Sequence, residues 1–159
     1  MTSGAELLLR IALESPDQPD VRQLIADLDA YQDTLYPPEC RYVLDIAGLL
    51  EPRVRFVVSR DAAGAAVACG ALVLQADHAE VKRLYVVPSW RRHGAARAVL
   101  SRLEQEAGVA GCSLVCLETG PLQPEALSLY DRLGYARRGP FGNYREDAMS
   151  VFMEKRLSR

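Results

Sequence analysis

The stretch that decides the fold is Val81-Lys82-Arg83-Leu84-Tyr85-Val86-Val87-Pro88-Ser89-Trp90-Arg91-Arg92-His93-Gly94-Ala95-Ala96. An apolar strand ends at Pro88, and a short loop leads into a helix. The small side chains from Gly94 to Ala96 let a ligand approach the backbone, where the unpaired N–H groups of a first helical turn suit a phosphate. Arg91, Arg92 and Arg97 add positive charge at the same place. The stretch predicts a strand–loop–helix unit that binds a compact anion.

On either side of this stretch the chain alternates strand-like and helix-like patterns, without an internal repeat. Strands are expected over residues 6–13, 54–59, 65–75, 79–87, 113–118, 135–138 and 149–154, and helices over residues 20–35, 42–50, 96–107 and 124–133. Asp20 is expected to cap the first helix and Gly108 to end the third. The second to fourth strands are consecutive and read as antiparallel, whereas the fourth and fifth strands flank a helix and read as parallel. The pattern predicts an α+β fold with a mixed, mostly antiparallel sheet of about seven strands flanked by about four helices.

Composition limits the class of protein. A chain of 159 residues, 49% of them hydrophobic, fits a single domain over residues 1–159. The apolar runs are far shorter than the roughly 20 residues that span a bilayer. The N-terminus does not resemble a secretory signal either. We expect a cytoplasmic protein without a membrane partner.

Charge is distributed unevenly along the chain. Residues 82–102 carry 6 basic and no acidic side chains, whereas residues 1–81 carry 6 basic and 13 acidic ones. The formal net charge is only -2. Positive charge confined to one short segment of an acidic protein favours a small anionic ligand and argues against a nucleic acid partner.

Cysteine and histidine show no pattern of a redox or metal site. They are scattered, at Cys40, Cys69, Cys112, Cys116, His78 and His93. No CxxC motif occurs, and the two histidines lack metal-ligand spacing. The cysteines are expected to be buried thiols, and no metal is expected.

Two motifs resemble those of a known family. Arg91-x-x-Gly94-x-Ala96 resembles the Q/R-x-x-G-x-G/A acetyl-coenzyme A signature of the GNAT superfamily of N-acetyltransferases. The run from Ala126 to Tyr135 resembles the A-x-x-L-Y-x-x-x-G-[FY] helix that follows the coenzyme site in that family. The resemblance covers residues 79–139 and implies a GNAT fold. The aromatic loop from Gly139 to Asp147 resembles the acceptor-side loop of a bacterial subgroup that acetylates small molecules.

The resemblance implies an acetyl-coenzyme A site on the strand–loop–helix unit. The backbone of the strand would pair with the pantetheine arm, and amides of the loop and helix would hold the pyrophosphate. Many relatives carry an asparagine against the pantetheine where this chain has a glutamine, which offers the same groups on a longer arm. The residues expected to bind acetyl-coenzyme A are Leu84, Tyr85, Val86, Arg91, Arg92, His93, Gly94, Ala95, Ala96, Arg97 and Gln123.

Catalytic roles are implied for two residues. Tyr130 would be the general acid that protonates the departing thiolate; alternatively, it is a core aromatic residue. Glu80 would be the general base for the substrate ammonium; alternatively, it is a strand residue that faces water. Tyr31 and Tyr144 would line the acceptor pocket, unless the loop that holds Tyr144 only covers the sheet.

These inferences predict an acetyl-coenzyme A-dependent N-acetyltransferase. It would acetylate the primary amine of a small molecule by direct transfer in a ternary complex, without a covalent enzyme intermediate. The alternative is a coenzyme A or acyl-coenzyme A binding or sensing module without catalysis. A dinucleotide-binding domain is disfavoured because G-x-G-x-x-G is absent. A homodimer is expected because dimers are common in the family that the sequence resembles.

Overall fold

The computed structural model describes residues 8–40 and 44–158. Its strands are β1 (Arg10–Leu13), β2 (Val54–Arg60), β3 (Ala66–Leu74), β4 (Ala79–Val86), β5 (Leu114–Thr119), β6 (Ala136–Arg138) and β7 (Val151–Arg156). Its helices are α1 (Pro19–Asp33), α2 (Ile46–Leu49), α3 (Ala95–Val109) and α4 (Pro124–Arg132), with 3-10 turns η1 (Pro38–Cys40) and η2 (Pro88–Trp90).

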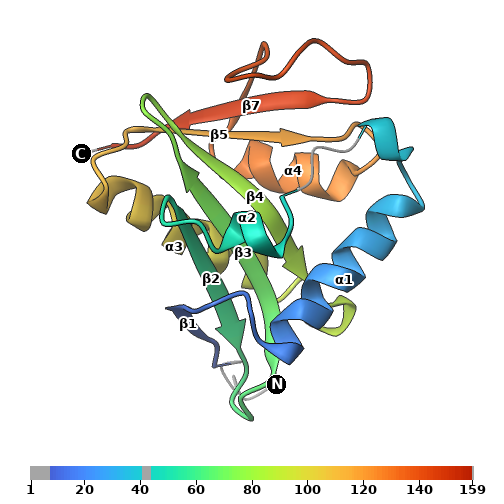
Figure 1. Ribbon diagram of the computed structural model, residues 1–159, viewed down its shortest axis with the longest axis vertical. Helices are drawn as coiled ribbons and strands as arrows, with labels where there is room; N and C mark the ends of the chain where they lie inside the picture. Colours follow the sequence, from blue (N-terminus) through green and yellow to red (C-terminus); the bar gives the residue numbers. More distant parts are fainter. Residues whose placement is uncertain (1–7, 41–43, 159) are drawn as a thin grey trace, which may run out of the picture.

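One sheet holds all seven strands in the order β1-β2-β3-β4-β5-β7-β6 (Figure 1). Neighbouring strands are antiparallel except for β4 and β5, which are parallel. The parallel pair needs a crossover, and α3 provides it. The α+β class and the mixed seven-stranded sheet predicted from the sequence are confirmed.

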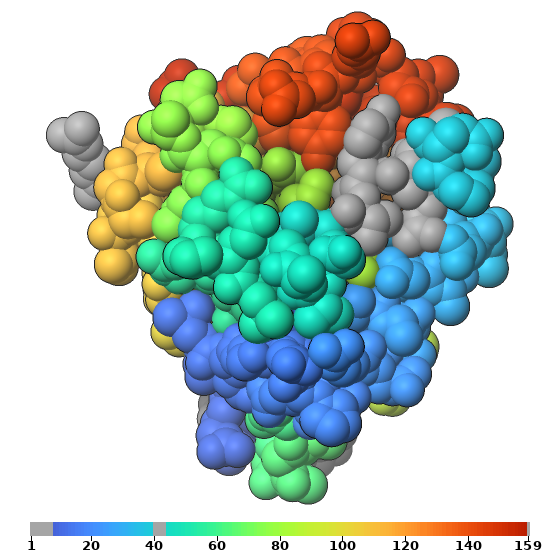
Figure 2. Space-filling view, in the orientation of Figure 1, coloured from blue at the N-terminus to red at the C-terminus, as the bar shows by residue number. Residues whose placement is uncertain are grey.

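Helices cover both faces of this sheet. Residues of β2 alternate between the faces, so that Val57 packs in the cluster that contains α3 while Phe56 and Val58 pack against α1 and α2. Figure 2 shows the face that α1 and α2 cover, with the chain before β7 beside them at the top of the view. Among the described helices, none is long and apolar enough to cross a membrane.

Helix ends differ from expectation at two places. Asp20 does not cap α1, because the helix begins one residue earlier at Pro19, a residue whose preset φ suits a first turn. The Asp20 carboxylate instead pairs with Arg60 at 2.6 Å. Gly108 lies inside α3, and Gly111, with φ 84°, follows the helix end. Sequence periodicity located these helices but not their exact ends.

Two expected elements are shorter in the described chain. The strand expected over residues 6–13 is observed as β1, and its first two residues lie outside the described part. The helix expected over residues 42–50 is α2, which begins after an Asp45 cap; residues 42 and 43 also lie outside the described part.

The sheet opens between β4 and β5. The two strands pair at Ala79, Glu80 and Val81 only, and no pairing continues beyond Val81. Two residues further along, β4 has a bulge against β3, where Arg83 adopts φ 59°. A bulge re-aims the strand and breaks its side-chain alternation. The separation of the two strands leaves space for a site between them.

Candidate active site

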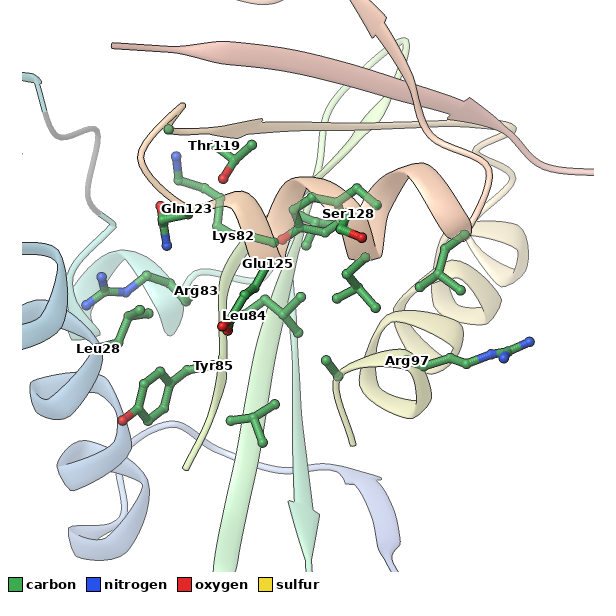
Figure 3. A pocket seen from close by; sticks show the side chains of 18 of the residues that line it. Leu28, Lys82, Arg83, Leu84, Tyr85, Arg97, Thr119, Gln123, Glu125 and Ser128 are labelled. Atoms are coloured by element: carbon green, nitrogen blue, oxygen red, sulfur yellow. The ribbon is translucent and has the colours of Figure 1, made fainter. Parts of the chain in front are cut away.

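A cavity of about 1040 Å³ lies where β4 and β5 part (Figure 3). Its walls come from the C-terminal half of α1, from β4, from the loop into α3, from the end of β5 and from α4. Parts of the chain that are distant in sequence therefore share one cavity, as expected for a ligand-binding site.

Most of the residues expected to bind the coenzyme line this cavity. They are Leu84, Tyr85, Val86, Arg91, Arg92, Gly94, Ala95, Ala96, Arg97 and Gln123. His93 is an exception, because it is exposed outside the lining with its ring edge-on to Trp90 at 5.9 Å. The structure thus brings the strand, the loop and Gln123 together around one space.

The loop into α3 has the conformation of an anion site. Arg92 and Gly94 both have positive φ, 66° and 80°, and α3 starts directly after Gly94. Gly94 has no side chain with which to cap the helix, so the first-turn N–H groups of Ala95 to Arg97 have no capping partner. A Cβ on Gly94 would meet open space, so nothing in the protein fills this position. Phosphate oxygens suit these amides.

Arg91 is held beside the cavity by backbone and aromatic contacts. Its Nε donates to the Val86 carbonyl at 3.2 Å. Its guanidinium lies 5.9 Å from the ring centres of both Tyr31 and Tyr85. Tyr31 therefore borders Arg91 and does not belong to the cavity lining where it was expected.

Glu80 and Tyr144 meet on the face of the sheet that α1 covers. The Tyr144 hydroxyl donates to Glu80 Oε2 at 2.5 Å and accepts from Lys82 Nζ at 2.8 Å. Lys82 also lies 3.4 Å from the same carboxylate oxygen. Glu80 is only 7% exposed, and its carboxylate is held by Tyr144 and Lys82 inside this cluster. The alternative of a water-facing Glu80 is wrong, and the predicted acceptor residue Tyr144 lines the cavity.

Glu118 is a second carboxylate in the cavity, and sequence reasoning missed it. Its Oε2 is buried and has no hydrogen-bond partner among the described residues. Burial is the main cause that raises the pKa of Glu118 to about 7; the charge of Lys82 opposes this shift, and the charges of Glu80 and Asp147 assist it. The sequence signal that could have identified Glu118 is an acidic residue in the mostly apolar strand β5. Such a carboxylate changes its protonation state near neutral pH.

Tyr130 lies on α4 with its ring edge-on to Tyr135 at 5.8 Å. It is 7% exposed but still lines the cavity. Burial, and then the nearby charge of Glu118, raise the pKa of Tyr130 above its usual value. Its phenol therefore keeps its proton and can donate a hydrogen bond into the cavity.

Within residues 8–40 and 44–158, no group of three or more His, Cys, Asp or Glu side chains could hold a metal ion. The lining offers carboxylates, phenols, an ammonium, guanidinium groups, carboxamides and backbone amides.

Comparisons with known proteins match this arrangement. Residues 18–135 match the model of the acetyltransferase (GNAT) family. The chain is 46% identical over 149 residues to the IAA acetyltransferase of Azospirillum brasilense, covering 92% of this chain and 97% of that protein. It is 36% identical over 124 residues to the uncharacterized N-acetyltransferase YsnE of Bacillus subtilis (strain 168), covering 76% of this chain and 82% of that protein.

A solved structure is similar over almost its entire length. A Klebsiella pneumoniae protein named as an acyl-CoA N-acyltransferase superposes with a TM-score of 0.83 at 37% identity, covering 95% of this chain and 99% of that one. Family model, relatives and solved structure agree, and the chain belongs to the GNAT family of acetyltransferases.

Proposed function

We propose that this protein transfers the acetyl group of acetyl-coenzyme A to the primary amine of a small molecule, directly and in a ternary complex. The observation that carries the proposal is the opening between β4 and β5, which leads at one end to the bare amides of α3 and at the other to a carboxylate with a pKa near 7. Coenzyme A binding without catalysis does not require a carboxylate such as Glu118 that ionises near neutral pH.

Residues along the cavity offer partners for each part of acetyl-coenzyme A. The amides from Arg92 to Arg97 would hold the diphosphate, with the side chains of Arg92 and Arg97 adding charge. The β4 edge from Leu84 to Val86, which β5 leaves unpaired, would hold the pantetheine arm. Acetyl-coenzyme A supplies an acetyl group activated as a thioester. The amides that follow the Arg83 bulge would polarise its carbonyl group.

Glu118 is the proton acceptor that this geometry favours. An amine arrives protonated at neutral pH and must lose a proton before its lone pair can attack. A carboxylate with a pKa near 7 accepts a proton more readily than an ordinary one, and proton transfer is most efficient when that value lies near the working pH. Glu80 is bound to Tyr144 and Lys82, so we assign it a structural role in the acceptor half of the site.

Tyr130 would assist departure of the thiolate by donating a hydrogen bond. Complete transfer of its proton would be uphill, because the pKa of a phenol lies above that of a thiol even before burial raises it. Each unit of that difference costs about 1.4 kcal/mol. Tyr130 is therefore assigned to stabilising negative charge on sulfur, which refines the general-acid role expected from the sequence.

Direct transfer is supported by the state of the buried thiols. Burial raises the pKa of Cys69 to about 12 and that of Cys116 to about 11. Thiols with such values stay protonated and are poor nucleophiles. Neither residue lines the cavity. A covalent acetyl-cysteine step has no support at these positions.

The experiment that tests the proposal combines binding and turnover. Isothermal titration calorimetry with acetyl-coenzyme A would measure binding, and release of free thiol would measure turnover across a panel of small amines. We expect binding together with amine-dependent thiol release. Binding without release for any amine would favour the sensing module, and absence of binding would overturn both.

A further inference from the structure

Tyr36 lines the cavity from the segment between α1 and η1. Its hydroxyl contacts the loop between β5 and α4. The hydroxyl oxygen accepts from the Leu122 backbone N–H at 3.1 Å, and the hydroxyl donates to Gln123 Oε1 at 3.3 Å. Tyr36 is 7% exposed, and burial raises its pKa, so the hydroxyl keeps the proton that it donates.

Gly120 is what lets Tyr36 take this position. A Cβ added to Gly120 would overlap the hydroxyl and the ring of Tyr36. Gly120 has no positive φ that would explain a glycine, so close approach of the ring is the reason for it. The loop is therefore shaped to receive the phenol.

The contact determines how Gln123 presents its carboxamide. Its oxygen is engaged by Tyr36, while no described residue accepts a hydrogen bond from its Nε2. Gln123 lines the cavity, and Figure 3 shows its side chain projecting from the start of α4. With the oxygen held at Tyr36, both N–H donors of the amide remain for a ligand.

We propose that Tyr36 is a positioning residue that fixes the Gln123 carboxamide so that its Nε2 donates to an amide carbonyl of the coenzyme arm. This inference rests on the proposed function, because the pantetheine arm supplies the amide carbonyls. The contact needs the reach of glutamine, since an asparagine at position 123 would be one methylene too short to meet the Tyr36 hydroxyl from the same backbone position.

The test is a double-mutant cycle on coenzyme A affinity, measured by calorimetry on Tyr36→Phe, Gln123→Asn and the double variant. Phenylalanine keeps the ring over Gly120 and removes only the hydroxyl. Losing one positioned hydrogen bond weakens binding by about tenfold. Because Tyr36 acts through Gln123, the double variant should bind as weakly as Gln123→Asn alone. Gln105→Asn, on the exposed face of α3, is the matched control and should bind like the wild type.

Steady-state kinetics separate positioning from a general structural effect. We expect KM for acetyl-coenzyme A to rise about tenfold in Tyr36→Phe, with kcat changed by less than about twofold. Gly120→Ala, which displaces the whole ring, should reproduce the effect on affinity, and thermal unfolding curves establish that each variant is folded.

Two outcomes overturn the inference. One is binding of coenzyme A by Tyr36→Phe as tightly as by the wild type, and the other is a double variant in which the losses of the two single variants multiply. Both leave the proposed function standing. Failure of the wild-type protein to bind coenzyme A would instead refute the proposed function.

Discussion

Tyr144 donates a 2.5 Å hydrogen bond to Glu80, a residue 64 positions earlier in the chain. The bond joins the loop before β7 to the middle of the sheet at the floor of the cavity. Lys82 donates to the same hydroxyl at 2.8 Å. The aromatic ring of Tyr144 also packs edge-on to Phe141 at 5.1 Å, which holds the loop in place.

Tyr144→Phe should weaken use of the amine without affecting the coenzyme. The variant loses a hydrogen bond to a buried carboxylate, which contributes about 1.5–3 kcal/mol. We expect KM for the amine to rise about tenfold or more while the affinity for coenzyme A, measured by calorimetry, stays unchanged. An equal loss of both affinities would mean that Tyr144 only supports the fold.

Glu118→Gln should remove the acidic limb of the pH–rate profile. With the pKa of Glu118 near 7, kcat/KM of the wild type should rise through pH 7 as the carboxylate ionises. The amide cannot accept the proton, so the rate should fall by about a hundredfold or more and lose that limb. Glu80→Gln is the matched variant and should keep the limb. If Glu80→Gln loses the acidic limb and Glu118→Gln keeps it, Glu80 is the base.

Glu118 should also make stability depend on pH. Its pKa is raised in the folded state, so the unfolded chain ionises first, and the free energy of unfolding should decrease as pH rises from about 4.5 to about 7. The loss is on the order of 3 kcal/mol. Urea unfolding at several pH values should show this decrease in the wild type and not in Glu118→Gln. If the free energy of unfolding depends on pH in the same way in both proteins, the pKa of Glu118 is not raised.

Tyr130→Phe should lower kcat and leave coenzyme affinity intact. A hydrogen bond to a charged group contributes about 1.5–3 kcal/mol, which corresponds to a decrease in kcat of about 10- to 150-fold. Single-turnover thiol release measures this step. Full turnover at neutral pH would return Tyr130 to the role of a core aromatic residue.

Gly94→Ala and Gly64→Ala form a matched pair. Both glycines have φ near 80–90° with open space around the missing Cβ, so both variants should lose about 1 kcal/mol of stability from backbone strain. Gly94 starts α3 at the expected diphosphate site, whereas Gly64 lies in the turn between β2 and β3. Calorimetry should show weaker coenzyme binding in Gly94→Ala only. Equal binding by the two variants would argue against the amide site.

The sequence by itself determined the order of strands and helices, the parallel β4–β5 pair and the position of the loop that leads into α3. These follow from local rules: apolar periodicity, and glycine and proline at element ends. Most of the residues expected to bind the coenzyme line the cavity, and all but Gln123 are close together in the chain, within one strand–loop–helix unit.

Only the tertiary structure decided which distant segments meet in the cavity. Glu118, Tyr36 and the Glu80–Tyr144 bond join segments that are far apart in sequence, and no local pattern reports such contacts. Tyr31 was misplaced for the same reason, since its neighbour is Arg91 from another element. The raised pKa of Glu118 is a property of burial, which the neighbouring residues in sequence do not reveal.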